Sequence, residues 1–176
     1  ASDVYKRQIL KGADISKYHI NPTTNYITFK PESFQQIAPT EMYRAPEKLL
    51  YRFISNQLVF AYDDKQTLSL NSCNIVIPKL DGIKLKYILA ILNSRVAQFI
   101  YKREFNSVKV LRSHIECIPI PAVDEQTQDK IISLTNQLID GLDGELLFTK
   151  YDELDTIICE LYKLTNEEQK IIKQAV

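Results

Sequence analysis

The sequence is poor in the residues that build phosphate-binding loops and metal sites. It contains four glycines, three cysteines, two histidines and no tryptophan among 176 residues. The glycine-rich patterns GxGxxG and GxxxxGKS/T are absent, as are the catalytic patterns HExxH and GxSxG. These absences give no reason to expect a nucleotide-dependent enzyme, a zinc peptidase or a serine hydrolase of the α/β type.

The cysteines and histidines are too widely spaced to suggest a metal site. Cys73, Cys117 and Cys159 are isolated and odd in number, without CxxC spacing, and His19 and His114 are far apart. Scattered cysteines of this kind are typical of reduced, intracellular proteins, where they act as small buried apolar residues. We therefore expect no bound metal and a cytoplasmic protein.

Long hydrophobic runs are missing too. No stretch approaches the roughly 18 to 20 apolar residues that span a bilayer, and the first residues form no signal-peptide pattern. A chain that is 45% hydrophobic and 25% charged is typical of a soluble globular domain. Because position 1 is not methionine, we expect a piece of a longer protein, and whether residues 1–8 are native stays open.

The charge is zero overall but uneven along the chain. Residues 1–121 carry 17 lysines and arginines against 10 acidic residues, a net of +7, whereas residues 122–176 carry 5 against 12, a net of −7. Such asymmetry suggests that the first part faces a polyanion and the second part faces something else. We therefore divide the chain into a basic body, residues 1–121, and an acidic C-terminal segment, residues 122–176. An ordinary surface composition is the alternative.

The most regular hydrophobic pattern lies in residues 84–103 and predicts one long helix. Apolar side chains recur there at spacings of three and four, on one face of a 3.6-residue helix. They are Leu85, Ile88, Leu89, Leu92, Val96, Phe99 and Ile100. A strand-like piece, an Arg-Ser-His turn at residues 112–114 and a stop at Pro119 and Pro121 follow.

The residues before this helix predict a sheet. Alternating or β-branched apolar segments predict strands at residues 26–29, 58–62, 67–70 and 74–77, and residues 8–10 form a short apolar segment before them. Pro46 suits the first turn of a short helix over residues 47–55, with Leu49, Leu50 and Phe53 inward.

After Pro121 the pattern predicts helices alone. Asp124 can cap a helix that closes near Gly141, and apolar spacing predicts a second amphipathic helix around residues 154–162. Thr165, with a glutamate three residues on, opens a last helix through a capping box. The predicted fold is therefore α+β: a mixed, twisted sheet packed with helices, followed by a helical C-terminal segment.

No group of residues predicts catalysis. Asn21-Pro22 lacks the second proline and the aromatic residue of the Asn-Pro-Pro-Tyr motif of amino methyltransferases, so we interpret it as a turn. Turn chemistry explains Asp63 and Asp64 as well as acid–base chemistry does. His114 is better explained as a surface or capping residue than as a catalytic base.

Three basic clusters lie beside aromatic or small polar residues and indicate nucleic-acid contact. Lysine and arginine neutralise phosphates, and Arg, Asn, Gln and Ser can read base edges. The clusters are Arg44, Lys48 and Arg52 near Tyr43 and Tyr51; Lys102, Arg103 and Lys109 near Tyr101, Phe105 and Asn106; and Arg112, Ser113 and His114. The alternative for each cluster is a solvated surface, and for the aromatic residues a place in the core.

Several short segments occur in a recognisable order. They are ILKGADI at 9–15, YRAPEKLL at 43–50, LVFAYDD at 58–64, YILAILNS at 87–94 and LRSHIECIPIP at 111–121, with Glu-Gln at 125–126. In this order, over roughly residues 8 to 165, they resemble the C-terminal specificity domain of TaqI-like adenine-specific DNA methyltransferases. Specificity subunits of type I restriction systems share the junction from LNS to the Glu-Gln pair.

The resemblance implies a target recognition domain of a restriction-modification system. In such proteins a separate catalytic lobe holds S-adenosylmethionine and the Asn-Pro-Pro-Tyr pocket. The specificity domain grips duplex DNA so that the target adenine can be extruded into that pocket. The resemblance thus implies no catalytic residue and no cofactor in this chain. Its implied partners are double-stranded DNA and the methyltransferase domain of the same parent protein; whether that parent also carries a nuclease stays open.

We expect phosphate and groove contacts from cations of the basic body, and base-edge contacts from small polar residues. The cations are Arg44, Lys48, Arg52, Lys102, Arg103, Lys109 and Arg112. The polar candidates are Ser69, Asn71, Asn106 and Ser113, with His114 in the same turn. The acidic helices should face away from DNA, because their charge would repel phosphates, or pack on a neighbouring domain.

Two other functions stay open. One is the recognition domain of a type I restriction specificity subunit, in which the C-terminal helix would be a long spacer, whereas Gly141 and Gly144 interrupt it here. The other is a protein-interaction module whose helices dock partner proteins. Salt dependence separates these functions, because a DNA-binding domain loses affinity steeply between about 50 and 200 mM salt.

Overall fold

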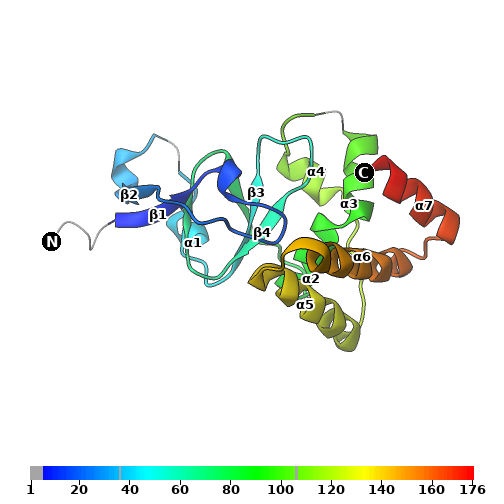
Figure 1. The fold of residues 1–176 in the computed structure, drawn as a ribbon. Helices are drawn as coiled ribbons and strands as arrows, with labels where there is room; N and C mark the ends of the chain where they lie inside the picture. The colour runs from blue at the N-terminus through cyan, green and yellow to red at the C-terminus, as the bar shows by residue number, and fades with distance from the viewer. Residues whose placement is uncertain (1–5, 36, 106) are drawn as a thin grey trace.

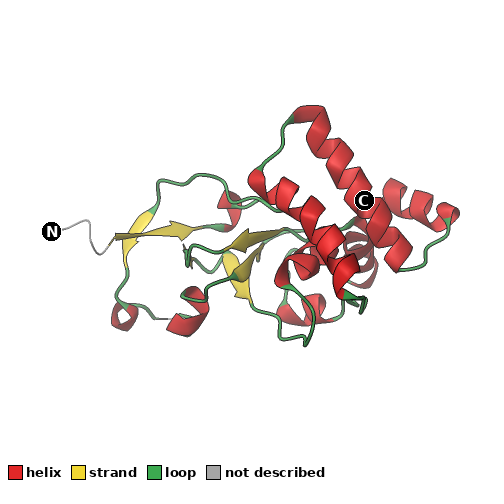
Figure 2. Cartoon of the chain, turned by 90° about the horizontal axis from the view of Figure 1, so that it is seen from below, coloured by secondary structure: helices red, strands yellow, loops and turns green. Residues whose placement is uncertain are grey.

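The structure, a computed structural model, describes residues 6–35, 37–105 and 107–176. The strands lie toward the N-terminal end of the molecule, and the longer helices gather at the other end around the C-terminus (Figure 1 and Figure 2). This arrangement confirms the α+β class and the helical C-terminal segment.

The strands of the described residues form two small sheets. The first has the order β2-β1-β5 and consists of β1 (Lys6–Leu10), β2 (Tyr26–Thr28) and β5 (Leu68–Ser69). The second has the order β4-β3-β6 and consists of β3 (Lys48–Arg52), β4 (Phe60–Asp63) and β6 (Cys73–Val76). The first sheet is mixed, because β1 runs antiparallel to β2 and parallel to β5, and the second is antiparallel throughout.

The helices include four short or medium ones before Pro121 and three after it in the described ranges. They are α1 (Thr40–Tyr43), α2 (Leu85–Asn93), α3 (Arg95–Glu104), α4 (Arg112–Glu116), α5 (Glu125–Asp140), α6 (Gly144–Leu161) and α7 (Asn166–Ala175). Single 3-10 turns occur at Gly12–Asp14 and Pro31–Ser33. None of the helices in the described ranges has both the length and the apolar character that a bilayer span requires.

The segment around β3 is a strand, so the short helix predicted at residues 47–55 is wrong. Leu49 and Tyr51 enter the main core, whereas Leu50 enters a smaller core on the opposite face. A strand covered on both faces is apolar at nearly every position, and such a short run cannot be told from a buried helix by its periodicity. Pairing with β4 on one side and β6 on the other decides the outcome.

A break at Ser94 divides the predicted long helix into α2 and α3. Ser94 has an extended backbone, with φ −67° and ψ 159°, and its Oγ accepts a hydrogen bond from Ala97 N at 3.1 Å. A serine in this position satisfies a free N–H of the following helix, so it ends α2 and caps α3. The apolar periodicity continues across the break, which explains why the pattern predicted one helix.

Asn93, the residue before the break, ties α2 to the outer edge of β4. Its Nδ2 donates to Phe60 O and its Oδ1 accepts from Phe60 N, both at 2.9 Å. On α3, Gln98 Oε1 accepts from Leu58 N at 2.8 Å. These side-chain amides take the place of a neighbouring strand and satisfy backbone groups that would otherwise be buried without partners.

The caps of the C-terminal helices are those that the sequence predicts. Asp124 accepts a hydrogen bond from Thr127 N at 2.7 Å, and α5 ends at Gly141, whose φ of 94° favours glycine. Thr165 and Glu168 form the capping box of α7. Helix α5 packs on α2, α6 packs on α5 and α3, and α7 packs on α3.

The acidic C-terminal helices form ion pairs with the basic body. Lys84 Nζ lies 2.9 Å from Glu125 and 2.7 Å from Asp129, and Arg95 lies 2.6 Å from Asp152. The two oppositely charged parts of the chain therefore neutralise part of each other's charge.

The cysteines differ in environment. Cys73 and Cys159 are buried, as predicted, but Cys117 is exposed, so its assignment to the core is wrong. Cys117 follows the five-residue helix α4, which turns Ile115 inward and leaves the positions around it in solvent.

Candidate nucleic-acid interface

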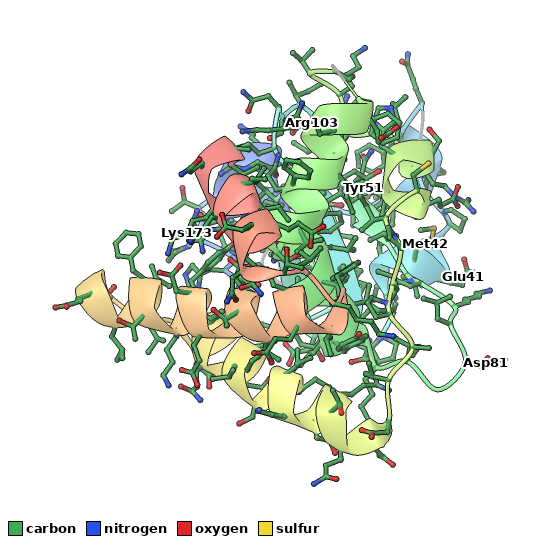
Figure 3. All side chains as sticks on the ribbon, turned by 90° about the vertical axis from the view of Figure 1, so that its right-hand side faces the viewer. Glu41, Met42, Tyr51, Asp81, Arg103 and Lys173 are labelled. Atoms are coloured by element: carbon green, nitrogen blue, oxygen red, sulfur yellow. The ribbon has the colours of Figure 1, made fainter. Side chains whose placement is uncertain are left out.

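A cleft of about 1460 Å³ opens along β6. One wall is the irregular segment 29–43 with α1, the other is α4 with the residues that follow it, and β6 with its continuation to Leu80 lies between them. Met42 and Glu41 of the first wall lie on the same side of α3 as Tyr51 (Figure 3).

The cleft exists because β6 is the outermost strand of its sheet in the described residues. The outer wall contains little regular structure, and aromatic packing supports it instead. The Phe29 ring stacks on Phe34 with centroids 6.1 Å apart, and it meets Tyr43 edge-on at 5.9 Å. Aromatic pairs at these distances contribute packing beyond the area they bury.

The cleft brings together three of the predicted contact residues. Ser69 ends β5 and is buried, Asn71 is exposed in the turn before β6, and Arg112 is exposed at the start of α4. An asparagine amide can donate and accept, and an arginine guanidinium presents several donors in one plane. Residues from separate parts of the sequence thus place complementary hydrogen-bonding groups on one surface.

Arg112 is the most accessible of these groups. Its side chain is 86% exposed, and its Nε donates to Glu116 Oε1 at 2.7 Å, four residues along α4. An exposed pair of this kind is weak because water competes for both charges, so a phosphate or a base edge can displace the glutamate. Ser113 is exposed beside it.

Other predicted cations are exposed but do not line the cleft. Arg44 follows α1 and adjoins the outer wall, and Lys109 lies in the loop that leads into α4. Arg103, near the end of α3, lies over the Phe99 ring at 5.2 Å. Lys102 is also exposed, but it lines a different cavity.

Lys48 is completely buried and therefore does not reach the surface in this structure. Its Nζ forms an ion pair with Asp63 and donates to Tyr43 O at 2.9 Å. Asp63 also accepts hydrogen bonds from Thr67 N and Thr67 Oγ1. Burial alone would raise the pKa of Asp63, but the hydrogen bonds from Lys48 and Thr67 hold it below its usual value. The ionised pair links β3 to β4.

Two further predicted residues have structural partners. Arg52 donates from Nε and Nη2 to Ile15 O, with the Nε bond at 2.9 Å, and so fixes the 11–20 loop against β3. His114 accepts a hydrogen bond from Leu111 N at 3.2 Å through Nδ1 and stacks on Phe105 at 4.1 Å. This capping position agrees with the alternative given for His114 above.

The predicted contact Asn106 lies outside the described residues. The cleft also contains polar residues that the sequence analysis did not single out, notably Asn74, whose Nδ2 lies 3.4 Å from Tyr51 Oη, and the exposed Lys79. A polar residue inside an otherwise apolar strand was the available signal for Asn74.

The chemistry of the cleft favours binding. Cys73 lines it, but burial raises the pKa of its thiol to about 12, which leaves almost no thiolate at neutral pH. Its carboxylates are Glu41 and Glu116 on opposite walls, and Glu116 is paired with Arg112. The described lining offers donors and acceptors around an apolar floor.

Three comparisons relate the chain to known proteins. A family model described as the TaqI-like C-terminal specificity domain matches residues 7–120. No curated protein matches the chain. The fold is similar to that in the structure of the type IIL restriction-modification enzyme MmeI in complex with DNA, with a TM-score of 0.62 and 12% sequence identity over 98% of this chain. The match covers 32% of that enzyme's chain, so the present chain spans about a third of its length.

Proposed function

The chain belongs to the family of TaqI-like C-terminal specificity domains, and we propose on this basis that it recognises a DNA sequence on behalf of a restriction-modification enzyme. The parent protein is then an adenine-specific, S-adenosylmethionine-dependent DNA methyltransferase. The chain grips duplex DNA and presents the target adenine to a catalytic lobe elsewhere in that parent. The cofactor belongs to that lobe, since the four glycines of this chain provide no nucleotide-cradling loop.

The cleft along β6 is the proposed reading surface. The observation that carries this assignment is the meeting of Arg112 and Asn71, which are 41 positions apart in sequence, at one cleft with Asn74. Arginine and asparagine are the side chains best suited to guanine and adenine edges, respectively. Reading by side chains from α4 and from the β6 floor of the cleft would fix the register of the bases as well as their identity.

Phosphate contacts are assigned to the exposed cations around the cleft. Arg44 stands beside the outer wall, Lys109 lies in the loop that leads into α4, and Arg103 lies near the end of α3. We remove Lys48 from the predicted contacts because it is buried in an ion pair, and Arg52 because its Nε and Nη2 are engaged by Ile15 O. Ser69 is assigned a supporting role because it is 8% exposed.

Duplex binding as a function of salt tests the proposal. With three exposed cations at phosphates, the logarithm of the association constant should fall with the logarithm of salt concentration at a slope of about −3. Fluorescence anisotropy of a labelled duplex, from about 50 to 200 mM salt, measures that slope. Selection from duplexes with a randomised centre should then enrich one sequence. Absence of binding at low salt, or binding that ignores salt, overturns the proposal.

A protein-interaction module is the second candidate, because the cleft exposes apolar side chains. Ile37, Leu70 and Leu80 line it and are 39%, 37% and 47% exposed. A protein partner that fills the cleft by apolar contact would bind with little dependence on salt, which the same titration distinguishes. The type I spacer reading is disfavoured, because α5 ends at Gly141 and α6 starts in a new direction (Figure 1).

A further inference from the structure

A second cavity, of about 420 Å³, lies between α3, α6 and the loop at residues 16–18. Helix α6 begins on the side of α3 away from Tyr51 and Met42, so this cavity and the cleft open on different sides of α3 (Figure 3). The volume lies within the range of small-molecule sites. The proposed function assigns no role to it.

The lining of this cavity is cationic on one side and apolar on the other. Its described charged residues are Lys17, Arg95 and Lys102, and none of the residues that line it is acidic. The apolar lining comes from the C-terminal helices and includes Leu147 and the exposed Phe148. A ligand that fills such a cavity carries an anionic group on an apolar body.

Gln98 supplies a hydrogen-bond donor that has no partner within the described structure. The residue is 4% exposed, and its Oε1 accepts from Leu58 N at 2.8 Å. That bond fixes the amide orientation, because the nitrogen of the side chain cannot accept from a backbone N–H. Its Nε2 is buried without a hydrogen bond, and Gln98 lines the cavity. Buried donors without a partner are rare in proteins. Because almost none of the Nε2 surface is accessible, an acceptor that enters from the cavity must displace the side chains that cover this atom.

Lys17 adds a positive charge to the same cavity, and hydrogen bonds hold its ammonium group in place. Its Nζ donates to Asn93 O at 3.0 Å and to Tyr151 Oη at 2.8 Å, which leaves one of its three N–H bonds available. Burial lowers the pKa of Lys17 to about 8, so the ammonium still predominates at neutral pH. Arg95 is already paired with Asp152 and Asp155, whereas Lys102 is exposed at the rim, where its Nζ donates to Ala175 O at 3.4 Å.

We propose that this cavity binds a nucleoside phosphate. Gln98 Nε2 and Lys17 Nζ donate to phosphate oxygens, Lys102 closes over the phosphate from the rim, and the base lies on the wall formed by Leu147 and Phe148. A phosphate offers enough acceptors for all three donors, and a flat base suits an aromatic and aliphatic wall. This site goes beyond the DNA-reading cleft and does not depend on it.

Calorimetric titration of the 176-residue chain with AMP tests the proposal, with adenosine and inorganic phosphate as partial ligands. AMP should bind about tenfold or more tightly than either part, since both walls contribute only with the whole ligand. Equal binding of adenosine and AMP, or no AMP binding, overturns the proposal. A 5′-phosphorylated hexanucleotide identifies the source of the phosphate: tighter binding than AMP indicates a strand end, and weaker binding indicates a free nucleotide.

Gln98→Glu is the decisive variant. The glutamate keeps an oxygen that accepts from Leu58 N and replaces the free donor by a negative oxygen, so AMP affinity should fall below detection. Lys102→Ala serves if that variant does not fold, because Lys102 is exposed; it should weaken AMP binding about tenfold. Lys170→Ala, which removes an exposed lysine of α7 outside the cavity, is the matched control and should bind AMP like the unchanged chain. Unchanged affinity in both Gln98→Glu and Lys102→Ala contradicts the site.

Discussion

Two groups of cations that look alike in the sequence occupy opposite environments in the structure. Lys48 and Arg52 of β3 are held inside the sheet by Asp63 and by Ile15 O. Lys109 and Arg112, before and within α4, are exposed. A residue in the central strand of a covered sheet meets protein on both faces, so its charge needs an internal partner. A short helix such as α4 turns only one face inward, so a charged residue on its other faces can stay in solvent without an internal partner.

The comparison shows that the number of basic residues in the sequence overstates the positive charge that a polyanion meets at the surface. Lys48 adds to the +7 of residues 1–121, yet it is neutralised by Asp63 at the centre of the molecule. The basic surface is therefore smaller than the composition indicates.

The largest expected effect comes from breaking the interior pair. Lys48→Met leaves Asp63 buried without its cation, and the free energy of unfolding should fall by about 3–5 kcal/mol. Urea denaturation measures the loss. The double variant Lys48→Met/Asp63→Asn removes both charges and should regain part of it. A loss below about 1 kcal/mol for Lys48→Met would mean that the buried pair stabilises the fold no more than an exposed pair does.

The second largest expected effect concerns Asp155, a buried carboxylate of α6. Burial raises the pKa of Asp155 to about 6, against a partial offset from Arg95, whereas the pKa of Asp63 is lowered. The folded state thus binds the Asp155 proton more tightly than the unfolded state does. The Asp155 contribution to stability is greatest below about pH 4 and decreases as pH rises to about 6, by about 2–3 kcal/mol.

Asp155→Asn tests this pH dependence. The difference in unfolding free energy between the unchanged chain and the variant should change between about pH 4 and 6 and stay constant above that range. Asp140→Asn, at the exposed end of α5, is the control and should show no such change. A constant difference across the whole range for Asp155→Asn would contradict the raised pKa.

The third effect separates binding from stability at the surface. Arg44→Ala combined with Arg112→Ala should weaken duplex binding about tenfold or more and reduce the salt slope by about 1, because Arg44 is assigned to a phosphate and Arg112 to a base edge. The unfolding free energy should change by less than about 0.5 kcal/mol. The double variant Lys130→Ala/Lys170→Ala, on the acidic helices, removes the same charge and should bind DNA normally. Normal binding by the arginine variant would exclude these two residues.

The smallest effect concerns the cap of α4. His114→Ala removes the acceptor for Leu111 N and the stack on Phe105, and stability should fall by about 1 kcal/mol. The thermal midpoint measures this change. A DNA affinity that falls far more than the stability would instead assign His114 a direct contact.

Local signals predicted the C-terminal helices, whereas pairing between distant residues decided the rest. The caps at Asp124 and Thr165 depend on neighbours three residues away, so the sequence displays them directly. The strand at β3 depends on β4 and β6, and no local pattern distinguishes it from a helix. The break at Ser94 had a local signal, because serine is a common helix cap, but the uninterrupted apolar spacing concealed it.

The sequence predicted a site made of basic and small polar residues, but not which of those residues lie together. Arg112 was predicted as part of a basic cluster, and Asn71 as a small polar residue between two predicted strands. Their meeting at one cleft follows from the position of β6 at the edge of its sheet. The burial of Lys48 could not be predicted either, because its partner Asp63 is brought opposite by strand register, Lys48 facing Asp63 across β3 and β4.

The hydrogen bonds of Asn93 and Gln98 close the β4 edge of the second sheet to a further strand. At that edge, Phe60 N, Phe60 O and Leu58 N are already satisfied, so another chain finds no free ladder there to extend. The opposite edge, β6, lies open at the cleft. Stacking of copies into a continuous fibre needs two open edges, and this sheet supplies one. Two side-chain amides therefore protect this edge from polymerisation while the cleft at the other edge stays accessible.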